Sequence, residues 1–212
     1  MLNICVNCGL YRPDKIIDPA GPYAICPECG HRQLFRRLPL FIVSGASGAG
    51  KSTVCHHLLG KVTEVVLLDS DILWQPEFES PGAATPNFFE TWLRVAKSIG
   101  QSGRPVVLFG SGVGVPDNIE PSIERRYFAD VHYLALVCSD DALAGRLRDR
   151  PEWRQTYTPA YVSRQIAFNQ WFKGRTRDLT PAVELLDTTS SSISSTVEEV
   201  TAWIRAKMAA VS

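Results

Sequence analysis

The stretch LPLFIVSGASGAGKSTVCHHLLG, residues 38–60, decides the fold of this chain. An apolar run over residues 40–43 predicts a buried strand, and residues 52–59 have the pattern of a helix. Between them, residues 45–52 match G-x-x-x-x-G-K-[ST], the P-loop or Walker A motif, in the strand–turn–helix context that the motif requires. The sequence therefore predicts a phosphate-binding turn at the start of a helix.

Each residue type in this turn has a chemical reason. Glycines let the backbone wrap closely, backbone N–H groups and the helix N-terminus stabilise phosphates, and Lys51 can reach the β- and γ-phosphates. The hydroxyl of Ser52 can bind Mg²⁺. We expect a bound nucleotide to contact Gly45, Ser47, Gly48, Ala49, Gly50, Lys51, Ser52 and Thr53.

The rest of the chain alternates between strand and helix patterns. Apolar runs separated by helices predict a parallel sheet covered on both faces, so we expect an α/β fold with five strands. The further strands are expected at residues 64–69, 105–110, 131–138 and 182–187, and the further helices at 87–101, 140–149, 159–172 and 197–208. The segment SSSISS, residues 190–195, is expected to be a polar turn before the last helix.

Two carboxylates, Asp69 and Asp71, follow the second apolar run in LLDSDIL, residues 67–73. In an extended chain, residues i and i+2 point the same way, so the pair would lie on one side. Ligands bind beyond the carboxyl ends of parallel strands, which places the pair beside the P-loop. There a carboxylate can hold Mg²⁺ or accept a proton from an attacking hydroxyl. Two solvated acids in a turn are the alternative.

Arginines gather after the fourth expected strand. Residues 141–178 contain eight basic and four acidic residues in a chain whose formal net charge is zero. Arg146 and Arg150 are four residues apart and would share a helix face, while Arg154 follows in a turn after Pro151. Arginines supplied by a closing segment stabilise the charge of a transferred phosphoryl group. Solvated charges on a helix are the alternative.

Four of the six cysteines lie within the first thirty residues. They form two C-x2-C pairs separated by seventeen residues, a spacing typical of zinc sites. Four thiolates complete a tetrahedral Zn²⁺ site without an open position, so we expect a structural zinc bound by Cys5, Cys8, Cys26 and Cys29. Two disulfides are the less favoured alternative in an intracellular chain. Cys55 and Cys138 are expected to be buried core residues.

Length and charge limit the remaining possibilities. The 212 residues are 45% hydrophobic and 21% charged, which suits one sizeable core with a small appendage, divided here into residues 1–37 and 38–212. A sequence pI near 6.9 indicates no overall attraction to nucleic acid or to an anionic membrane. The N-terminus lacks a signal-peptide pattern, and no apolar run reaches the roughly 18 residues of a membrane span. We expect a soluble cytoplasmic protein whose oligomeric state the sequence does not indicate.

From about residue 40 to its end, the chain resembles the P-loop kinases of small molecules. The order strand, P-loop, helix and LDSD is similar to the LDxD segment of adenylylsulfate kinases and the D-x-D of shikimate kinases; gluconate kinases share the layout. The resemblance implies a five-stranded sheet in the order 2-3-1-4-5, with ATP and Mg²⁺ as cofactors. It also implies that Asp69 lies near the metal, that Asp71 activates the acceptor hydroxyl, and that Arg146 and Arg150 belong to a lid. Thr188 would then lie beside the adenine base, with helix capping as the alternative.

Two further features qualify this resemblance. Residues 3–35 resemble a zinc ribbon, a module that often contacts nucleic acid or other proteins. The third expected strand ends in Gly110, Ser111 and Gly112 instead of the acid that usually closes a Walker B strand. This departure argues against a motor ATPase. The glycines either let an acceptor approach or form a flexible turn.

We therefore expect an ATP- and Mg²⁺-dependent kinase that phosphorylates a hydroxyl of a small molecule. Rings between Asp71 and the third strand could stack on a nucleoside or nucleotide acceptor, although core packing is their alternative role. A nucleic-acid kinase, acting on RNA ends or bound tRNA docked by the ribbon, is a second hypothesis that the charge does not favour. A nucleotide-binding ATPase whose ribbon docks a protein partner is a third. The rings belong to Trp74, Phe78, Phe88, Phe89 and Trp92.

Overall fold

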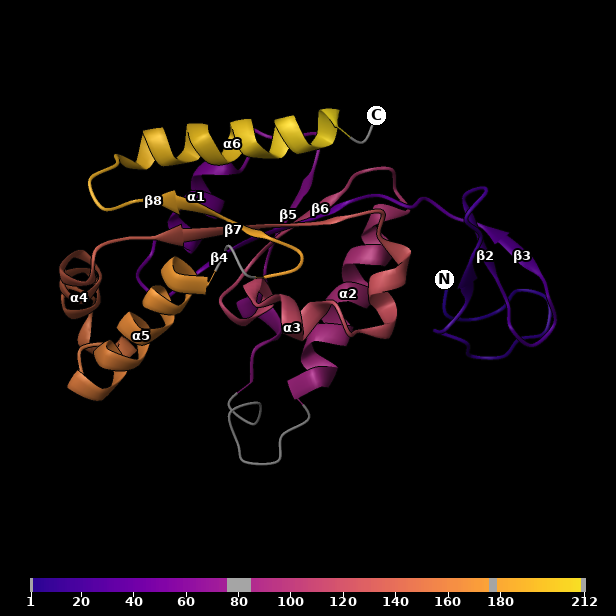
Figure 1. Cartoon of the computed structure of the whole chain (residues 1–212), viewed down its shortest axis with the longest axis horizontal. Coiled ribbons are helices and arrows are strands. Elements are labelled where there is room, and N and C mark those ends of the chain that lie inside the picture. The colour runs from indigo at the N-terminus through magenta and orange to yellow at the C-terminus, as the bar shows by residue number, and fades with distance from the viewer. Residues whose placement is uncertain (1, 76–84, 176–178, 211–212) are drawn as a thin grey trace.

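The computed structural model describes residues 2–75, 85–175 and 179–210. Its centre is a five-stranded parallel sheet in the order β5-β6-β4-β7-β8 (Figure 1). Numbered along the chain from the strand before the P-loop, this order is 2-3-1-4-5, which confirms the prediction. The strands are β4 (Leu40–Gly45), β5 (Val66–Asp69), β6 (Val106–Phe109), β7 (Val131–Val137) and β8 (Val183–Asp187).

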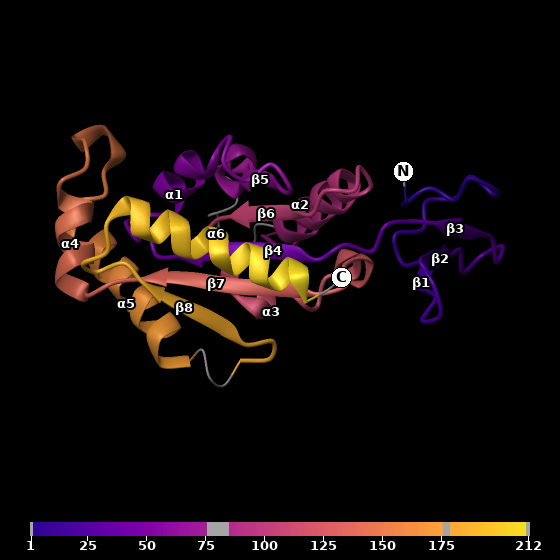
Figure 2. The same ribbon diagram turned by 90° about the horizontal axis from the view of Figure 1, so that it is seen from above.

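Helices cover both faces of this sheet. The α-helices are α1 (Lys51–Leu58), α2 (Thr85–Gly100), α3 (Pro116–Ile119), α4 (Asp140–Arg148), α5 (Pro159–Arg175) and α6 (Ile193–Ala209). Short 3₁₀ turns follow several strands and helices: η1 (Ser70–Leu73), η3 (Gly112–Gly114), η4 (Ile123–Tyr127) and η5 (Glu152–Arg154). Figure 2 shows α6 lying across the strands. None of the described helices is long and apolar enough to cross a membrane.

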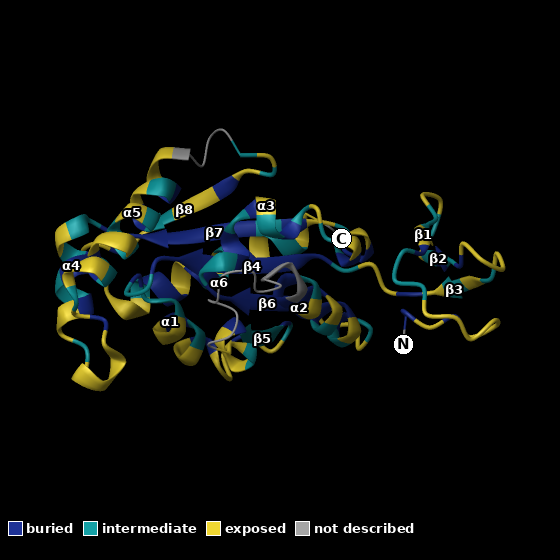
Figure 3. Cartoon of the chain, turned by 90° about the horizontal axis from the view of Figure 1, so that it is seen from below, coloured by how far each residue is buried: buried dark blue, intermediate teal, exposed yellow. Residues whose placement is uncertain are grey.

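Alternation along β4 explains the two layers. Leu40 and Ile42 point into a core formed with α2 and α5, whereas Phe41 and Val43 point into a second core beneath α1 and α6. Because both faces are covered, β4 is apolar at every position from 40 to 43, all fully buried. In Figure 3 the central strands are buried, whereas exposed residues lie on the outer sides of the helices, in the loops, on the edge strand β8 and in the N-terminal residues.

The N-terminal residues form a separate small sheet. Strands β1 (Ile16–Ile17), β2 (Tyr23–Ile25) and β3 (Arg32–Leu34) pair antiparallel, and the sheet lies beyond one end of the parallel sheet (Figure 1). The strands and the cysteine cluster together fit a small zinc ribbon. The division expected at residue 37 falls between β3 and β4.

The last helix begins earlier than the sequence predicts. We expected residues 190–195 to form a polar turn, but α6 starts at Ile193. The hydroxyl oxygen of Ser192 accepts a hydrogen bond from the backbone N–H of Ser195 at 3.1 Å and so caps the helix. Ser192 is therefore the N-cap of α6 and Ser194 and Ser195 lie in its first turn, whereas Ser190 and Ser191 precede the helix.

Candidate functional site

The P-loop has a backbone that only glycine can supply at its first position. Gly45 ends β4 with φ +137°, and a Cβ there would lie 2.3 Å from the carbonyl oxygen of Leu136 in β7. Gly48 and Gly50 also have positive φ, at +92° and +108°. Helix α1 then begins at Lys51. The turn therefore directs the first N–H groups of α1 toward the site, as an anion cradle requires.

Lys51 folds back over the P-loop. Its Nζ donates hydrogen bonds to the carbonyl oxygens of Gly45, at 2.8 Å, and Ala46, at 3.0 Å. Burial of the ammonium group lowers the pKa of Lys51 to about 8, an effect that nearby Asp71 partly opposes and Arg150 reinforces. The lysine is therefore held inside the cradle, and phosphate oxygens there would favour its charged form.

Asp69 and Ser52 bring two oxygens together beside the P-loop. Asp69 ends β5, and its Oδ2 lies 3.5 Å from the Oγ of Ser52 at the start of α1. A carboxylate oxygen and a hydroxyl oxygen are ligands that Mg²⁺ accepts, since this ion prefers few protein oxygens together with water and phosphate. The pair therefore fits a Mg²⁺ held jointly by protein and nucleotide.

Asp71 is positioned differently from the expectation for an extended strand. The strand ends at Asp69, and residues 70–73 form η1, so the two carboxylates do not share one strand face. Instead, Asp69 Oδ1 accepts a hydrogen bond from the backbone N–H of Asp71 at 3.0 Å and caps η1. Partial burial and the neighbouring Asp69 raise the pKa of Asp71. A raised pKa makes this carboxylate a stronger base.

Two cavities meet at the P-loop. The larger, of about 590 Å³, joins the P-loop to Asp71 and to the loop after β6. The smaller, of about 300 Å³, runs from the P-loop to the loop after β8 and the start of α6. Both include Gly48, Gly50, Thr53 and Arg150 in their walls. The P-loop therefore borders two cavities, and each is large enough to hold a small molecule or part of one.

The arginines reach different parts of the P-loop. We expected Arg146 and Arg150 on one helix face, but α4 ends at Arg148, because Pro151 follows closely, and only Arg146 is helical. Arg146 Nη1 donates to the hydroxyl of Thr188 at 3.1 Å, on the side of the smaller cavity. Arg150 Nη1 donates to the hydroxyl of Ser47 at 2.9 Å. Arg154 lines the larger cavity.

Thr188 does not cap α6, which Ser192 caps, but it joins three parts of the site. Its buried hydroxyl lies 3.2 Å from the carbonyl oxygen of Ala49 and 3.1 Å from that of Val137, and it accepts from Arg146. The loop after β8 is thereby tied both to the P-loop and to α4. Thr188 also lines the smaller cavity, and its contact with an adenine base stays a prediction.

The glycines after β6 serve close packing. A Cβ on Gly110 would lie 2.0 Å from the Oγ of Ser70, and a Cβ on Gly114 would lie 2.0 Å from the side chain of Ser44. Neither a flexible turn nor acceptor access requires such contacts. They bring Ser111 to the wall of the larger cavity, and its carbonyl oxygen accepts from the hydroxyl of Ser44 at 2.8 Å.

Three residues of the site escaped the sequence reasoning. His56 and His57 line the larger cavity. Their signal was available, because positions four residues after Ser52 and Thr53 share the same side of a helix. The third, Gln165 of α5, accepts a hydrogen bond from the backbone N–H of Ser47 through its Oε1 at 2.8 Å. Nothing local in the sequence indicates this contact.

The expected aromatic wall is mostly core. Phe88, Phe89 and Trp92 are buried against the sheet, which confirms the core alternative for these rings. Trp74 is 41% exposed and meets Phe88 edge-on at 5.5 Å between ring centroids. Phe78 lies outside the described residues. Among the described rings of this group, Trp74 is the exposed one, and its role in acceptor binding stays a prediction.

The four N-terminal cysteines converge on a point that a metal can occupy. Their sulfurs all lie within 4.8 Å of one another, with Cys5 to Cys29 at 3.6 Å and Cys8 to Cys26 at 3.9 Å. A tetrahedral Zn²⁺ with Zn–S bonds of about 2.3 Å places its sulfurs about 3.8 Å apart, whereas a disulfide needs about 2.05 Å. All six cysteines are free thiols. The cluster therefore fits zinc.

Two matching turns build this cluster. Gly9 and Gly30, with φ +73° and +71°, donate their N–H groups to the carbonyl oxygens of Cys5 and Cys26, each at 2.9 Å. The backbone N–H of Cys8 lowers the pKa of the Cys5 thiol to about 6, and that of His31 lowers the pKa of Cys29. The backbone N–H of Leu10 opposes a rise in the pKa of Cys8, but burial and the neighbouring thiols still raise that pKa to about 11. The backbone N–H groups thus favour thiolates, the metal-binding form, at Cys5 and Cys29 in particular. Elsewhere Cys138 is buried as expected, while Cys55 is only half-buried.

Comparison with known proteins shows a shared fold. No protein-family model matches the chain, and no curated protein sequence matches it. Among solved structures, a sugar kinase from Janibacter sp. HTCC2649 superposes with a TM-score of 0.58 and 16% identity, covering 81% of this chain and 97% of its own. A gluconokinase from Sinorhizobium meliloti 1021 gives 0.54 and 20%, covering 83% and 97%. Shikimate kinase from Bacteroides thetaiotaomicron gives 0.50 and 19%, covering 79% and 98%. At these identities the likeness concerns architecture, and the chain has the P-loop kinase fold that these proteins share.

Proposed function

We propose that this protein is an ATP- and Mg²⁺-dependent phosphotransferase that phosphorylates a hydroxyl group of a small molecule. The observation that carries the proposal is the larger cavity, in whose walls the P-loop residues Lys51 and Ser52, the carboxylate of Asp71 and the guanidinium of Arg150 come together. These are the groups that hold a triphosphate, receive a proton and balance negative charge. The sugar, gluconate and shikimate kinases that share the fold support the same reaction class.

ATP is placed across the two cavities. The triphosphate lies in the cradle from Gly45 to Thr53, and the nucleoside extends into the smaller cavity beside Thr188 and Ile193. Arg146, anchored on Thr188, borders the nucleoside, and Arg150, hydrogen-bonded to Ser47, faces the phosphates. Because Gln165 occupies the N–H of Ser47, phosphate binding displaces this side chain.

The acceptor occupies the part of the larger cavity beyond the γ-phosphate. Asp71 accepts the proton of its hydroxyl, and the raised pKa of this carboxylate suits the role. Ser52 and Asp69 hold Mg²⁺, which supplies positive charge to the phosphate oxygens when bound. Lys51 and Arg150 stabilise the negative charge that spreads over the transferred group. A nucleoside or a sugar is the acceptor class that we favour.

The remaining assignments complete the proposal. Residues 1–37 form a zinc ribbon with structural Zn²⁺ on the four cysteines, and residues 38–212 form the kinase domain. Six cysteines without a disulfide suit a reducing compartment such as the cytoplasm.

The test is a panel of nucleosides and sugars incubated with labelled ATP and Mg²⁺. One acceptor should raise ATP consumption severalfold and appear as the labelled product. Asp71→Asn should reduce that turnover by about a hundredfold or more while ATP still binds, because general-base catalysis contributes about 10²–10⁴-fold. Asp130→Asn is the matched control, since Asp130 precedes the first residue of β7 and so lies at the amino ends of the strands, opposite the P-loop. Turnover that survives Asp71→Asn removes the base assignment, and hydrolysis that no acceptor stimulates favours the ATPase hypothesis.

A further inference from the structure

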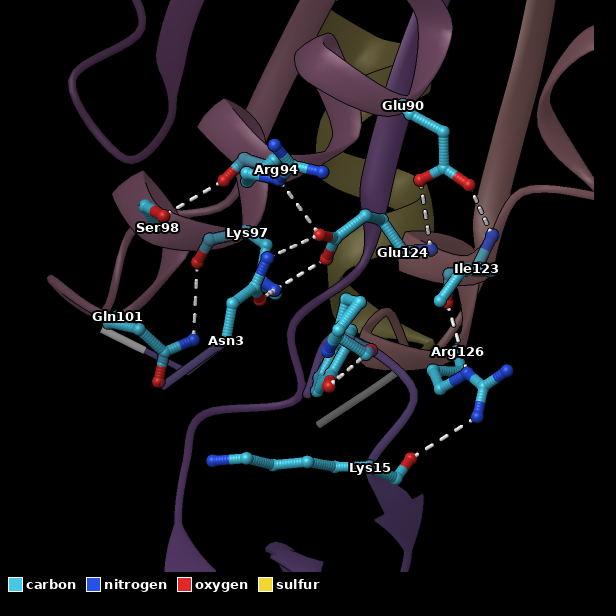
Figure 4. A network of polar contacts seen from close by, with 12 residues as sticks. Asn3, Lys15, Glu90, Arg94, Lys97, Ser98, Gln101, Ile123, Glu124 and Arg126 are labelled. Atoms are coloured by element: carbon cyan, nitrogen blue, oxygen red, sulfur yellow. Dashed lines mark hydrogen bonds and ion pairs between the residues drawn. The ribbon is translucent and has the colours of Figure 1, made fainter. Parts of the chain in front are cut away.

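The ribbon is joined to the kinase fold by a buried polar network. Its centre is Glu124 in η4, whose side chain is fully buried. The carboxylate accepts hydrogen bonds from Lys97 Nζ and from Arg94 Nε at 3.0 Å, both on α2, and from Asn3 Nδ2 at 2.7 Å (Figure 4). Lys97 also donates to Asn3 Oδ1. Three segments far apart in the sequence thus share one ion pair.

Further contacts surround this network on the ribbon side. The ammonium of Lys97 lies 4.0 Å from the ring centroid of Tyr127, and the hydroxyl of Tyr127 donates to the carbonyl oxygen of Pro13 at 2.7 Å. Arg126 donates to the carbonyl oxygen of Lys15 at 3.3 Å (Figure 4). It also donates to the carbonyl oxygen of Asp14 at 3.1 Å. These contacts hold the backbone of the ribbon against η4, and they fix the orientation of the ribbon.

Asn3 depends on the first cysteine turn for its place. It lies two residues before Cys5, and its carbonyl oxygen accepts from the N–H of Arg12 at 2.7 Å, across the hairpin that holds Cys5 and Cys8. Ile4 and Tyr11 form an isolated bridge within the same hairpin. A metal that fixes Cys5 and Cys8 therefore also fixes the side chain that meets Lys97 and Glu124.

Helix α2 carries this anchor to the acceptor side of the kinase. Its 16 residues extend about 24 Å, with Lys97 near the C-terminal end and Phe88 and Phe89 near the other. The ring of Phe88 contacts the ring of Trp74. The backbone N–H of Trp74 in turn donates a hydrogen bond to the backbone carbonyl oxygen of Asp71 at 3.0 Å. A Cβ on Gly112, next to the cavity-lining Ser111, would lie 3.4 Å from Phe89. The helix that the ribbon holds thus packs on both loops of the acceptor cavity.

We propose that the zinc-loaded ribbon is a positioning element for the acceptor side of the site, acting through Asn3, Lys97 and Glu124 on helix α2. Zinc binding orders the first cysteine turn, the buried ion pair transmits this order to α2, and α2 fixes the loops of Asp71 and Ser111. The nucleotide side is independent, because its cavity is lined by the P-loop, α1, α4 and the start of α6. The acceptor role in this inference rests on the proposed function, whereas the mechanical link does not.

The test compares hydrogen exchange in the full-length chain with zinc bound and after removal of zinc by a chelator in the presence of a thiol reductant. Removing zinc should accelerate amide exchange by about tenfold in residues 88–100 and 70–74 and leave α4 and α6 unchanged. ATP affinity, measured by titration calorimetry, should change by less than about twofold. None of these readouts needs an acceptor, so they remain informative if the kinase proposal fails.

A double variant separates transmission from folding. Lys97→Met/Glu124→Gln replaces the buried ion pair by neutral side chains of similar size, so the chain should fold and bind one zinc ion. In this variant α2 should exchange equally fast with and without zinc. Once an acceptor is known, the variant should raise its KM with little effect on the affinity for ATP. The inference is overturned if zinc removal leaves α2 exchange unchanged in the natural chain, if it accelerates all helices equally, or if the double variant keeps the zinc response.

Discussion

The affinity for ATP should fall as pH rises through about 8, because Lys51 must carry its proton to bind phosphate. Burial of the ammonium group lowers the pKa of Lys51 to about 8 in the free protein, although two carbonyl oxygens accept hydrogen bonds from it. A bound triphosphate favours the charged form and raises the pKa again. The protein that can bind ATP is therefore the fraction in which Lys51 is already protonated before ATP binds.

The size of the effect follows from that fraction. With a pKa of about 8, roughly three quarters of the free protein is protonated at about pH 7.5 and roughly a tenth at about pH 9. Apparent affinity scales with the competent fraction, so the dissociation constant should rise about eightfold across this interval. Binding at about pH 8 should take up roughly half a proton from the buffer.

Titration calorimetry in buffers of different ionisation enthalpy measures both quantities. Lys51→Arg is the matched control, because a guanidinium stays protonated over the whole interval. Its ATP affinity should be weaker but nearly constant from about pH 7.5 to about pH 9. A natural chain whose affinity is constant over this interval, or a Lys51→Arg variant that loses the same factor, would refute the reasoning.

Four single variants and one double variant test the packing through urea unfolding of the zinc-bound chain. Gly45→Ala should destabilise by more than about 3 kcal/mol, because its Cβ would lie 2.3 Å from a carbonyl oxygen of β7; a smaller loss would contradict this geometry. Gly145→Ala, in α4 with nothing within 4 Å of the new methyl, should instead stabilise by about 0.5–1 kcal/mol, and a loss of stability would show hidden crowding. Thr188→Val should cost about 1–3 kcal/mol and weaken ATP binding, since its buried hydroxyl ties the P-loop to α4; no change in either measurement would count against that role. Lys97→Met should cost about 3–5 kcal/mol of unfolding free energy, because it leaves the carboxylate of Glu124 buried without its lysine. The double variant Lys97→Met/Glu124→Gln should recover at least half of that loss. Equal losses in the two variants would show that the ion pair does not contribute to stability.

The sequence predicted the strands and their order because the relevant patterns are local or carried by a resemblance. A buried strand such as β4 reads as a continuous apolar run, and the P-loop is a contiguous motif whose function and backbone shape lie in the same eight residues. Helix ends were less predictable. The serines before α6 are equally suited to a turn and to an N-cap, and only the path of the chain after β8 distinguishes them.

The candidate site divides in the same way. Lys51, Ser52 and the four cysteines have positions set by short motifs, so the sequence alone determined which chemistry each could support. The tertiary structure decided where the other groups lie. Arg146 and Arg150 point in different directions because α4 ends between them. Arg146 therefore donates a hydrogen bond to Thr188, whereas Arg150 donates one to Ser47.

Contacts between distant segments lay beyond sequence reasoning altogether. The contact between Gln165 and Ser47 of the P-loop joins residues 118 positions apart along the chain. The pair of Lys97 and Glu124 joins residues 27 positions apart. In the sequence, Lys97 and Glu124 look like ordinary surface charges on a helix and in a turn. Folding places them at a junction where neither reaches water, and a buried charge must have a partner. The sequence by itself determined a P-loop, a parallel sheet and a cysteine cluster; only the tertiary structure decided that the cluster is anchored to the helix beside the acceptor cavity, because that anchor exists only where three distant segments meet.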